Sequence, residues 1–180
     1  QPIALGVNTD AYQPAERKLK ITRDILEVLL AHRHPVGIVT KSALVERDLD
    51  LLGDMAKRNL VHVMVSVTSL DKRLARSMEP RAAAPRRRLE SIRRLSAAGI
   101  PVGVLVAPVV PVLNDGEIES ILTQVRRAGA LSAGYVMLRL PHEVKDLFRS
   151  WLQRHVPLKA DHVMKRIRDI RGGRENDSQF

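Results

Sequence analysis

A short apolar segment, a polar loop and an amphipathic segment follow one another five times along this chain of 180 residues. The pattern predicts five strands, at Ile3–Asn8, Val36–Lys41, Val61–Thr68, Val102–Val110 and Ser132–Leu140. Each is a nearly continuous run of Val, Ile, Leu and Ala, which is typical of parallel strands covered on both faces. Strands that alternate with helices favour a parallel α/β sheet.

The alternation within one strand indicates where the chemistry lies. Between residues 61 and 68 every odd position is Val, whereas the even positions are His62, Met64, Ser66 and Thr68. Because successive side chains of a strand point to opposite faces, we expect the valines to pack against helices and the other four to face a more polar space. This asymmetry favours a barrel with helices outside and a functional lumen inside. Five units are too few for a closed eight-stranded barrel, so we predict a partial barrel.

The connecting segments predict helices at residues 14–32, 43–58, 71–78, 85–98, 115–128, 142–154 and 158–170, of which the last two follow the fifth strand. Helical spacing of apolar positions predicts that the first helix buries Ile21, Ile25, Val28 and Leu29. Asn114 or Asp115 is expected to cap the amino end of the fifth of these helices. We predict one domain over residues 1–171 and a flexible polar tail over residues 172–180.

The chain contains no Cys, which excludes disulfides, thiolate catalysis and cysteine-ligated metal from its own residues, and we predict no metal ligand in it. No apolar run approaches the ~20 residues of a membrane span. Without a recognisable signal peptide, the sequence predicts a cytoplasmic protein that does not contact membranes. The chain enters its first strand directly after Gln1-Pro2, which suggests a fragment of a longer protein.

The formal net charge of +10 is concentrated in two segments. Arg86, Arg87, Arg93 and Arg94 crowd one predicted helix, and a second basic run comprises Lys165, Arg166, Arg168, Arg171 and Arg174. Such clusters can bind phosphate backbones, so we predict a DNA- or RNA-binding surface at the first of them. The alternative is a solvated, arginine-rich surface without a partner. An aromatic content of 3% argues against a stacking platform for single strands.

Ligands of parallel α/β sheets and barrels bind at the carboxyl ends of the strands. The side chains expected to face inward there include Asn8, Asp10, Lys41, Ser66, Thr68, Ala107, Tyr135, Met137 and Arg139. Two cations and one carboxylate in an enclosed mouth suit a zwitterionic or anionic ligand.

Most of these residues also have a structural interpretation. Asp10 can cap the turn before Pro14, Lys41 can extend into solvent, and Ser66 and Thr68 can be ordinary strand residues. Arg139 can pair with Glu143 or Asp10. For Arg88, at the start of the helix over residues 85–98, an ion pair with Glu79 is the favoured interpretation.

Several segments together resemble a known family. They are NTDAYQPAE at residues 8–16, VTKS at 39–42, VSVT at 65–68, MEPR at 78–81, AGIPVGVLVAP at 98–108 and YVMLRLP at 135–141. From Ile3 to about Ile170 the chain resembles the spore photoproduct lyase-like branch of the radical S-adenosylmethionine (SAM) enzymes. It is most similar to the uncharacterised bacterial subgroup often labelled "DNA repair photolyase". The ensemble of segments is specific, whereas no single motif is.

The resemblance implies a partial (βα)6 TIM-like barrel, of which this chain supplies strands two to six and lacks strand one. It also implies a CxxxCxxC loop after the missing strand, whose thiolates hold a [4Fe–4S] cluster. SAM would bind that cluster, and its reductive cleavage would release a radical that abstracts hydrogen from a substrate. This chain departs from the family because it has no Cys. Either it is truncated, which its start favours, or the parent protein has lost the cluster.

Carried over residue by residue, the resemblance places Asn8, Thr9 and Asp10 where the family holds the amino group of SAM. Lys41 and Ser66 match positions that contact its carboxylate or ribose, and Ala107 and Met137 fall where adenine is bound. No catalytic residue follows from the comparison.

Three functions remain open from the sequence. The leading one is the core of a radical SAM enzyme acting on a substrate such as nucleic acid, with this chain inactive alone. The others are a Schiff-base lyase that uses Lys41 and a basic nucleic-acid-binding module without catalysis. An unpaired edge at the first strand further predicts a homodimer.

Overall fold

The computed structural model describes residues 1–175 and contains one sheet of five parallel strands. The strands are β1 (Ile3–Leu5), β2 (Val36–Thr40), β3 (Val61–Ser66), β4 (Val102–Val109) and β5 (Ser132–Met137). They lie in the order β1-β2-β3-β4-β5, so each strand pairs with its neighbour in sequence. A doubly wound sheet would reverse its strand order, whereas consecutive order is the arrangement of a barrel wall. The predicted α/β fold, a partial TIM-like barrel, is confirmed.

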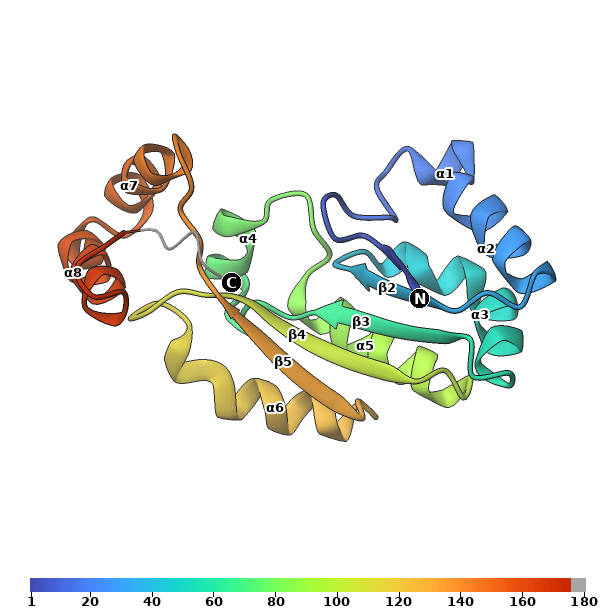
Figure 1. Cartoon of the computed structure of the whole chain (residues 1–180). Coiled ribbons are helices and arrows are strands. Elements are labelled where there is room, and N and C mark those ends of the chain that lie inside the picture. The colour runs from blue at the N-terminus through green and yellow to red at the C-terminus, as the bar shows by residue number, and fades with distance from the viewer. Residues whose placement is uncertain (176–180) are drawn as a thin grey trace.

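One face of the sheet is covered by helices, as Figure 1 shows for α3 (Leu49–Ala56), α5 (Pro85–Ala97) and α6 (Ile118–Arg127). The odd-numbered valines of β3 are buried on this face, in a core shared with Leu52, Ile92 and Ile121. The opposite face carries His62, Met64 and Leu105, which are only partly buried. The predicted division between an apolar helix side and a more open inner side is therefore confirmed.

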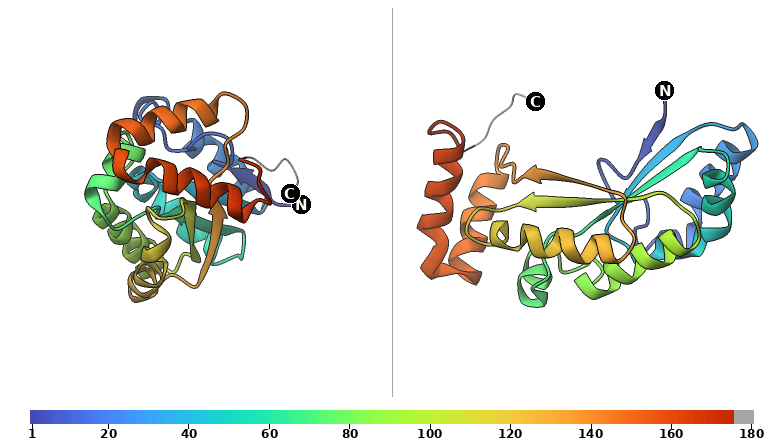
Figure 2. Two further views of the ribbon diagram at one scale, coloured as in Figure 1. Left: turned by 90° about the vertical axis from the view of Figure 1, so that its left-hand side faces the viewer. Right: turned by 90° about the horizontal axis from the view of Figure 1, so that it is seen from below.

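The remaining elements lie beside this wall or beyond it. They are α1 (Glu16–Leu19), α2 (Ile21–Ala31), α4 (Lys72–Met78), α7 (Val144–His155), α8 (Ala160–Ile170) and three short 3-10 turns at Ala43–Asp48, Asp115–Glu117 and Pro157–Lys159. Figures 1 and 2 show α7 and α8 beyond the carboxyl ends of β4 and β5. They form a second apolar core around Leu140, Leu152 and Val163. The mouth of the barrel wall therefore has α7 and α8 on one side.

The first predicted helix is divided, which changes the face that it buries. Lys20 takes a left-handed conformation with φ of 55° and separates α1 from α2. As a result α2 buries Thr22, Leu26 and Leu29. The prediction of the buried positions of this helix was wrong at three of the four, because Ile21, Ile25 and Val28 are 53%, 38% and 58% exposed.

The first strand is shorter than predicted. Gly6 has φ of +88°, and a Cβ at that position would lie 2.0 Å from the backbone oxygen of Val39. Only glycine fits such a close approach at positive φ, so the strand ends at Leu5 and the chain turns across the end of β2. The turn brings residues 7–14 toward the predicted binding mouth.

The predicted tail falls into two parts. Residues 172–175 are attached to the carboxyl-terminal helices, because the Glu175 carboxylate pairs with Lys145, Arg149 and Arg168. The flexibility of the tail stays a prediction, and residues 176–180 lie outside the described part. Within residues 1–175, no helix is long and apolar enough to cross a membrane.

Candidate functional site

A largely buried carboxylate, that of Glu79, joins the carboxyl ends of β2 and β3. Glu79 directly follows α4, and its side chain is 10% exposed. Its Oε1 lies 3.0 Å from Nζ of Lys41 and 2.9 Å from Oγ1 of Thr68, while its Oε2 lies 2.6 Å from Nη2 of Arg88. One carboxylate thus fixes two cations and a hydroxyl at the mouth of the barrel wall.

Arg88 anchors this arrangement from the first turn of α5. Its side chain is 3% exposed, and it donates to the backbone oxygens of Ala83 at 2.7 Å and Ser66 at 3.0 Å in addition to Glu79. Burial acts against the charge of Glu79 and is the largest single influence on its pKa. Arg88 and then Lys41 outweigh burial, so the pKa of Glu79 is lowered. The expected pairing of Arg88 with Glu79 is confirmed.

Ser66 and Thr68 lie beneath the mouth rather than around it. They are 2% and 1% exposed, and their hydroxyl oxygens lie 3.3 Å and 2.9 Å from the backbone oxygen of Ala107. The Thr68 hydroxyl has one hydrogen, so it donates either to Ala107 or to Glu79 at any one time. The expectation that both hydroxyls line the open mouth is wrong, because both side chains are buried.

Asn114 fixes the same region from the loop after β4. It is 1% exposed, accepts from the backbone N–H of Val110 at 2.6 Å and donates to the backbone oxygens of Thr68 and Pro108. The sequence suggested a helix cap here, but the Asn114 side chain makes no cap hydrogen bond. A buried amide that satisfies three backbone groups cannot be recognised from spacing along the chain.

Asp10 closes the loop after β1 onto β2. Its Oδ1 accepts from the backbone N–H of Tyr12 at 2.9 Å and from Oγ1 of Thr40 at 2.7 Å, and its Oδ2 accepts from the backbone N–H of Lys41 at 2.7 Å. The structural interpretation of Asp10 is therefore confirmed. Asn8 and Thr9 precede it in the same loop and are exposed.

A cavity of about 640 Å3 lies beside this loop, and three of the predicted residues line it, namely Thr9, Asp10 and Lys41. Arg17, Arg81 and Arg87 also line it, so its wall carries four cations and one carboxylate. The Lys41 side chain is 38% exposed, and the ion pair with Glu79 holds its ammonium in place. This composition fits the predicted zwitterionic or anionic ligand.

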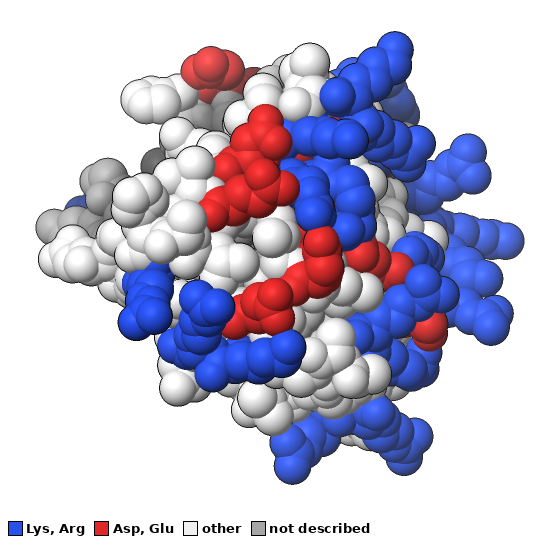
Figure 3. All heavy atoms as spheres, turned by 90° about the vertical axis from the view of Figure 1, so that its right-hand side faces the viewer, with Lys and Arg blue, Asp and Glu red and all other residues white. Residues whose placement is uncertain are grey.

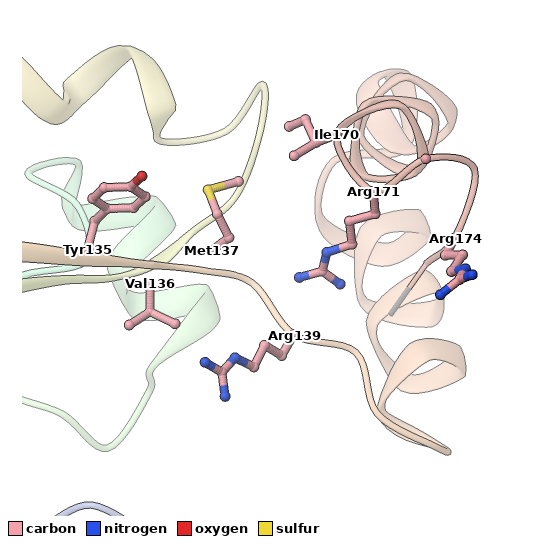
Figure 4. Close-up of a pocket in the computed structure, with 8 residues that line it drawn as sticks. Tyr135, Val136, Met137, Arg139, Ile170, Arg171 and Arg174 are labelled. Atoms are coloured by element: carbon pink, nitrogen blue, oxygen red, sulfur yellow. The ribbon is translucent and has the colours of Figure 1, made fainter. Parts of the chain in front are cut away.

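The two residues predicted to bind the cofactor from β5 and from the segment after it line a different cavity. Met137 and Arg139 line a space beside the end of α8, which shares no lining residue with the first cavity. The sheet register pairs Val106 with Tyr135 and Val109 with Met137, and Met137 packs against the core on the helix side. Figure 4 shows Tyr135 and Met137 on one side of the strand and Val136 and Arg139 on the other. The predicted inward orientation of Tyr135 and Met137 is wrong, because the strand's alternation runs opposite to that expected.

The arginines of α5 are largely engaged within the chain. Arg87 and Arg94 pair with Glu46, and Arg93 and Arg94 pair with Glu90. Leu89, Ile92 and Leu95 form the buried side of this helix. Figure 3 shows one face of the molecule, with many basic side chains along its right-hand margin and acidic side chains next to them toward the middle. Intramolecular pairing therefore reduces the positive field that α5 presents to a phosphate backbone.

Comparison with known proteins places the chain in a family. The model of the "Radical SAM superfamily" matches residues 3–125, which include β1 to β4 and the Lys41–Glu79 pair. The chain belongs to the radical SAM superfamily. It is 38% identical over 172 residues to an uncharacterized protein of Mycobacterium tuberculosis and to one of Mycobacterium bovis, covering 94% of this chain and 49% of each relative.

Two further relatives of this radical SAM chain come from distant sources. An uncharacterized protein of Acidianus two-tailed virus is 41% identical over 109 residues, which are 61% of this chain and 35% of the viral protein. An uncharacterized protein of Methanocaldococcus jannaschii is 32% identical over 109 residues, covering 61% of this chain and 40% of the relative. The chain thus spans about half the length of the mycobacterial relatives that it matches.

The residues of this radical SAM chain do not fit an iron–sulfur cluster. Clusters of this kind are held chiefly by Cys thiolates, and the sequence contains none. Within residues 1–175 no group of three His, Asp or Glu side chains is placed to hold a metal ion. The donor set at Lys41, by contrast, suits the polar groups of SAM, because an ammonium is an apt partner for a carboxylate.

Proposed function

We propose that this chain forms the SAM-holding wall of a radical SAM enzyme of the spore photoproduct lyase-like branch, and that the enzyme acts on nucleic acid. The observation that carries the proposal is the ammonium of Lys41, held by the largely buried Glu79 on a cavity at the carboxyl ends of the first strands. Membership of the radical SAM superfamily implies SAM as the cofactor, and the excess of cations on the cavity wall complements the carboxylate of SAM.

Lys41 binds the carboxylate of SAM in this proposal. An ammonium has three N–H donors, of which the ion pair with Glu79 occupies one. The remaining two donors are available to a ligand, while the ion pair with Glu79 limits the rotamers of the lysine. Asn8 and Thr9, exposed on the adjoining loop, supply polar groups toward the amino group of SAM.

Ser66, Thr68 and Ala107 support the site from below. Their hydrogen bonds join β3 to β4 directly beneath the mouth, and Arg88 binds the backbone oxygen of Ser66. We therefore assign the two hydroxyls a positioning role, and Ala107 a place under the adenine. When bound, SAM supplies the radical chemistry typical of the superfamily.

The contacts of Lys41 disfavour a Schiff-base lyase. A lysine nucleophile must lose its proton, and enzymes achieve this with an apolar pocket or a neighbouring cation. Lys41 is instead in an ion pair with the Glu79 carboxylate at 3.0 Å, which is neither of these settings. A nucleic-acid-binding module without catalysis is supported only by net charge, and Glu46 and Glu90 engage much of the α5 cluster.

Equilibrium dialysis of radiolabelled SAM against this chain tests the proposal. Lys41→Ala should weaken binding by roughly ten- to a hundredfold, since a hydrogen bond to a charged group contributes about 1.5–3 kcal/mol. Lys57→Ala is the matched control, because Lys57 pairs with Asp54 at 2.9 Å and does not line the cavity. Equal SAM affinity in the parent chain and both variants would contradict the proposed site.

A further inference from the structure

Two arginines on the wall of the cavity that Lys41 lines have no partner within the described chain. The cavity, of about 640 Å3, is also lined by Arg17, Arg81 and Arg87. Lys41 and Arg87 are each paired with a glutamate. Among residues 1–175, by contrast, no side-chain hydrogen bond or ion pair engages Arg17 or Arg81. Two full positive charges on this wall are therefore uncommitted.

The backbone that carries Arg17 is anchored by the preceding residue. Glu16 is 6% exposed, and its carboxylate accepts from the backbone N–H of Thr22 at 3.0 Å and from Nη2 of Arg47 at 3.2 Å. Nη1 of Arg47 also donates to the backbone oxygen of Glu16 at 2.6 Å. A buried carboxylate therefore fixes α1, while the side chain of the next residue stays available to a ligand.

The turn that carries Arg81 is fixed at both ends. Glu79 lies before it and is held by Arg88, whose Nε also donates to the backbone oxygen of Ala83 at 2.7 Å. The backbone N–H of Ala82 donates to the backbone oxygen of Glu79 at 3.1 Å. Because a site whose backbone is already ordered loses less entropy on binding, both uncommitted arginines stand on preorganised segments.

The acidic side chain on this wall is occupied by other groups. Among the described residues that line the cavity, Asp10 alone is acidic. It accepts from the backbone N–H groups of Tyr12 and Lys41 and from the hydroxyl of Thr40. These three donors direct the Asp10 carboxylate to β2 and to its own loop. The charge that the wall offers to a ligand is therefore positive.

Much of the remaining wall is apolar. Its apolar part includes Pro14, Ala43, Leu44, Ala82 and Ala83. Ligand sites typically combine a few charged groups with a mostly apolar wall, and the volume falls in their common range of about 300–1,000 Å3. An inorganic anion would leave the apolar surface without a partner. The composition of the cavity therefore fits an organic group that carries an anion.

We infer that this cavity binds a small phosphate monoester, with the phosphate on Arg17 and Arg81 and the organic group against the apolar wall. A phosphate monoester carries about 1.5 to 2 negative charges at pH 7, which two uncommitted guanidiniums match. Their planar forks also match the oxygens of a phosphate. The inference goes beyond the proposed function, because neither arginine is assigned to SAM. Ala107, proposed to lie under the adenine, does not line this cavity.

Isothermal titration calorimetry of this chain with phenyl phosphate tests the inference. Arg17→Ala and Arg81→Ala should each weaken binding roughly tenfold, since each removes a charge-assisted hydrogen bond to the phosphate. Arg86→Ala is the matched control and should leave the affinity unchanged, because Arg86 is an exposed arginine that does not line the cavity. Far-ultraviolet circular dichroism verifies that each variant is folded.

Two further ligands separate the contributions of the charge and of the organic group. Inorganic phosphate should bind roughly tenfold more weakly than phenyl phosphate, because it has no apolar group to bury against the wall. Methyl phenyl phosphate keeps the ring but carries a single charge, so it should also bind roughly tenfold more weakly.

Three results would overturn the inference. One is the absence of phenyl phosphate binding to the parent chain, or an affinity that is unchanged in folded Arg17→Ala and Arg81→Ala. Another is an equal loss in Arg86→Ala, which assigns the binding to the basic surface as a whole. The third is that inorganic phosphate or methyl phenyl phosphate binds as tightly as phenyl phosphate, which makes the ligand a free anion or a singly charged ester. The titrations contain no SAM, so their outcome does not depend on the proposed SAM site.

Discussion

Replacing Arg88 by Met should destabilise the protein strongly. The substitution keeps a long apolar stem but removes the donors to Glu79, Ser66 and Ala83, all from a side chain that is 3% exposed. Glu79 would retain Lys41 and Thr68 as partners but lose its closest cation. Removing one partner of a buried ion pair typically costs about 3–5 kcal/mol, because the other charge stays buried. A typical domain has only about 5–15 kcal/mol of stability.

Urea denaturation followed by circular dichroism measures this effect. With a dependence of about 2–3 kcal/mol per molar urea, the midpoint should fall by roughly 1–2.5 M. Arg93→Met on the same helix is the matched control, since Arg93 is 55% exposed and its pair with Glu90 contributes at most about 1 kcal/mol. Adding Glu79→Gln to Arg88→Met should recover part of the loss, because it removes the orphaned charge.

The reasoning fails if Arg88→Met shifts the midpoint no more than Arg93→Met does. That result would mean that water or Lys41 compensates the Glu79 carboxylate fully, so that Arg88 does not hold the site together.

Three further predictions concern pH, the cluster and the sheet edge. The pKa of the Glu79 carboxyl is lowered in the folded state. The contribution of the ionised carboxylate to stability is therefore complete above the ordinary pKa of 4.5 and is lost as the pH falls through the pKa of the folded state. Glu79→Gln should flatten the fall of the urea midpoint below about pH 5. Anaerobic reconstitution of this chain with iron and sulfide should yield no stoichiometric cluster absorption, because it has no thiolate, and a stoichiometric band would contradict the ligand assignment. Sedimentation over a concentration series should show that the chain associates through β1 and the apolar face of Ile21, Ile25 and Val28. Ile3→Lys, at the edge of the sheet, should weaken this association. A monomer at every concentration would contradict the predicted dimer.

The sequence by itself determined the wall of the barrel. Alternating Val in β3 and apolar runs in the other strands are local signals, and a strand's period of two assigns them to faces without knowledge of the neighbours. The same holds for α5, where Leu89, Ile92 and Leu95 recur at helical spacing and are buried. The pairing of Arg88 with Glu79 was also accessible, because the two residues flank one short connection.

Tertiary structure decided which polar groups meet. Lys41 and Glu79 are 38 positions apart by residue number, and only the parallel pairing of β2 with β3 brings their side chains to 3.0 Å. The left-handed Lys20 changed the buried face of α2, and the β4–β5 register turned Tyr135 and Met137 to the helix side. A one-residue change of phase exchanges the faces of a strand, and composition does not record it. The uncommitted arginines of the Lys41 cavity likewise come to one wall only after the chain folds. Local periodicity therefore specifies elements and their apolar faces, whereas the site depends on contacts between residues that are distant in sequence.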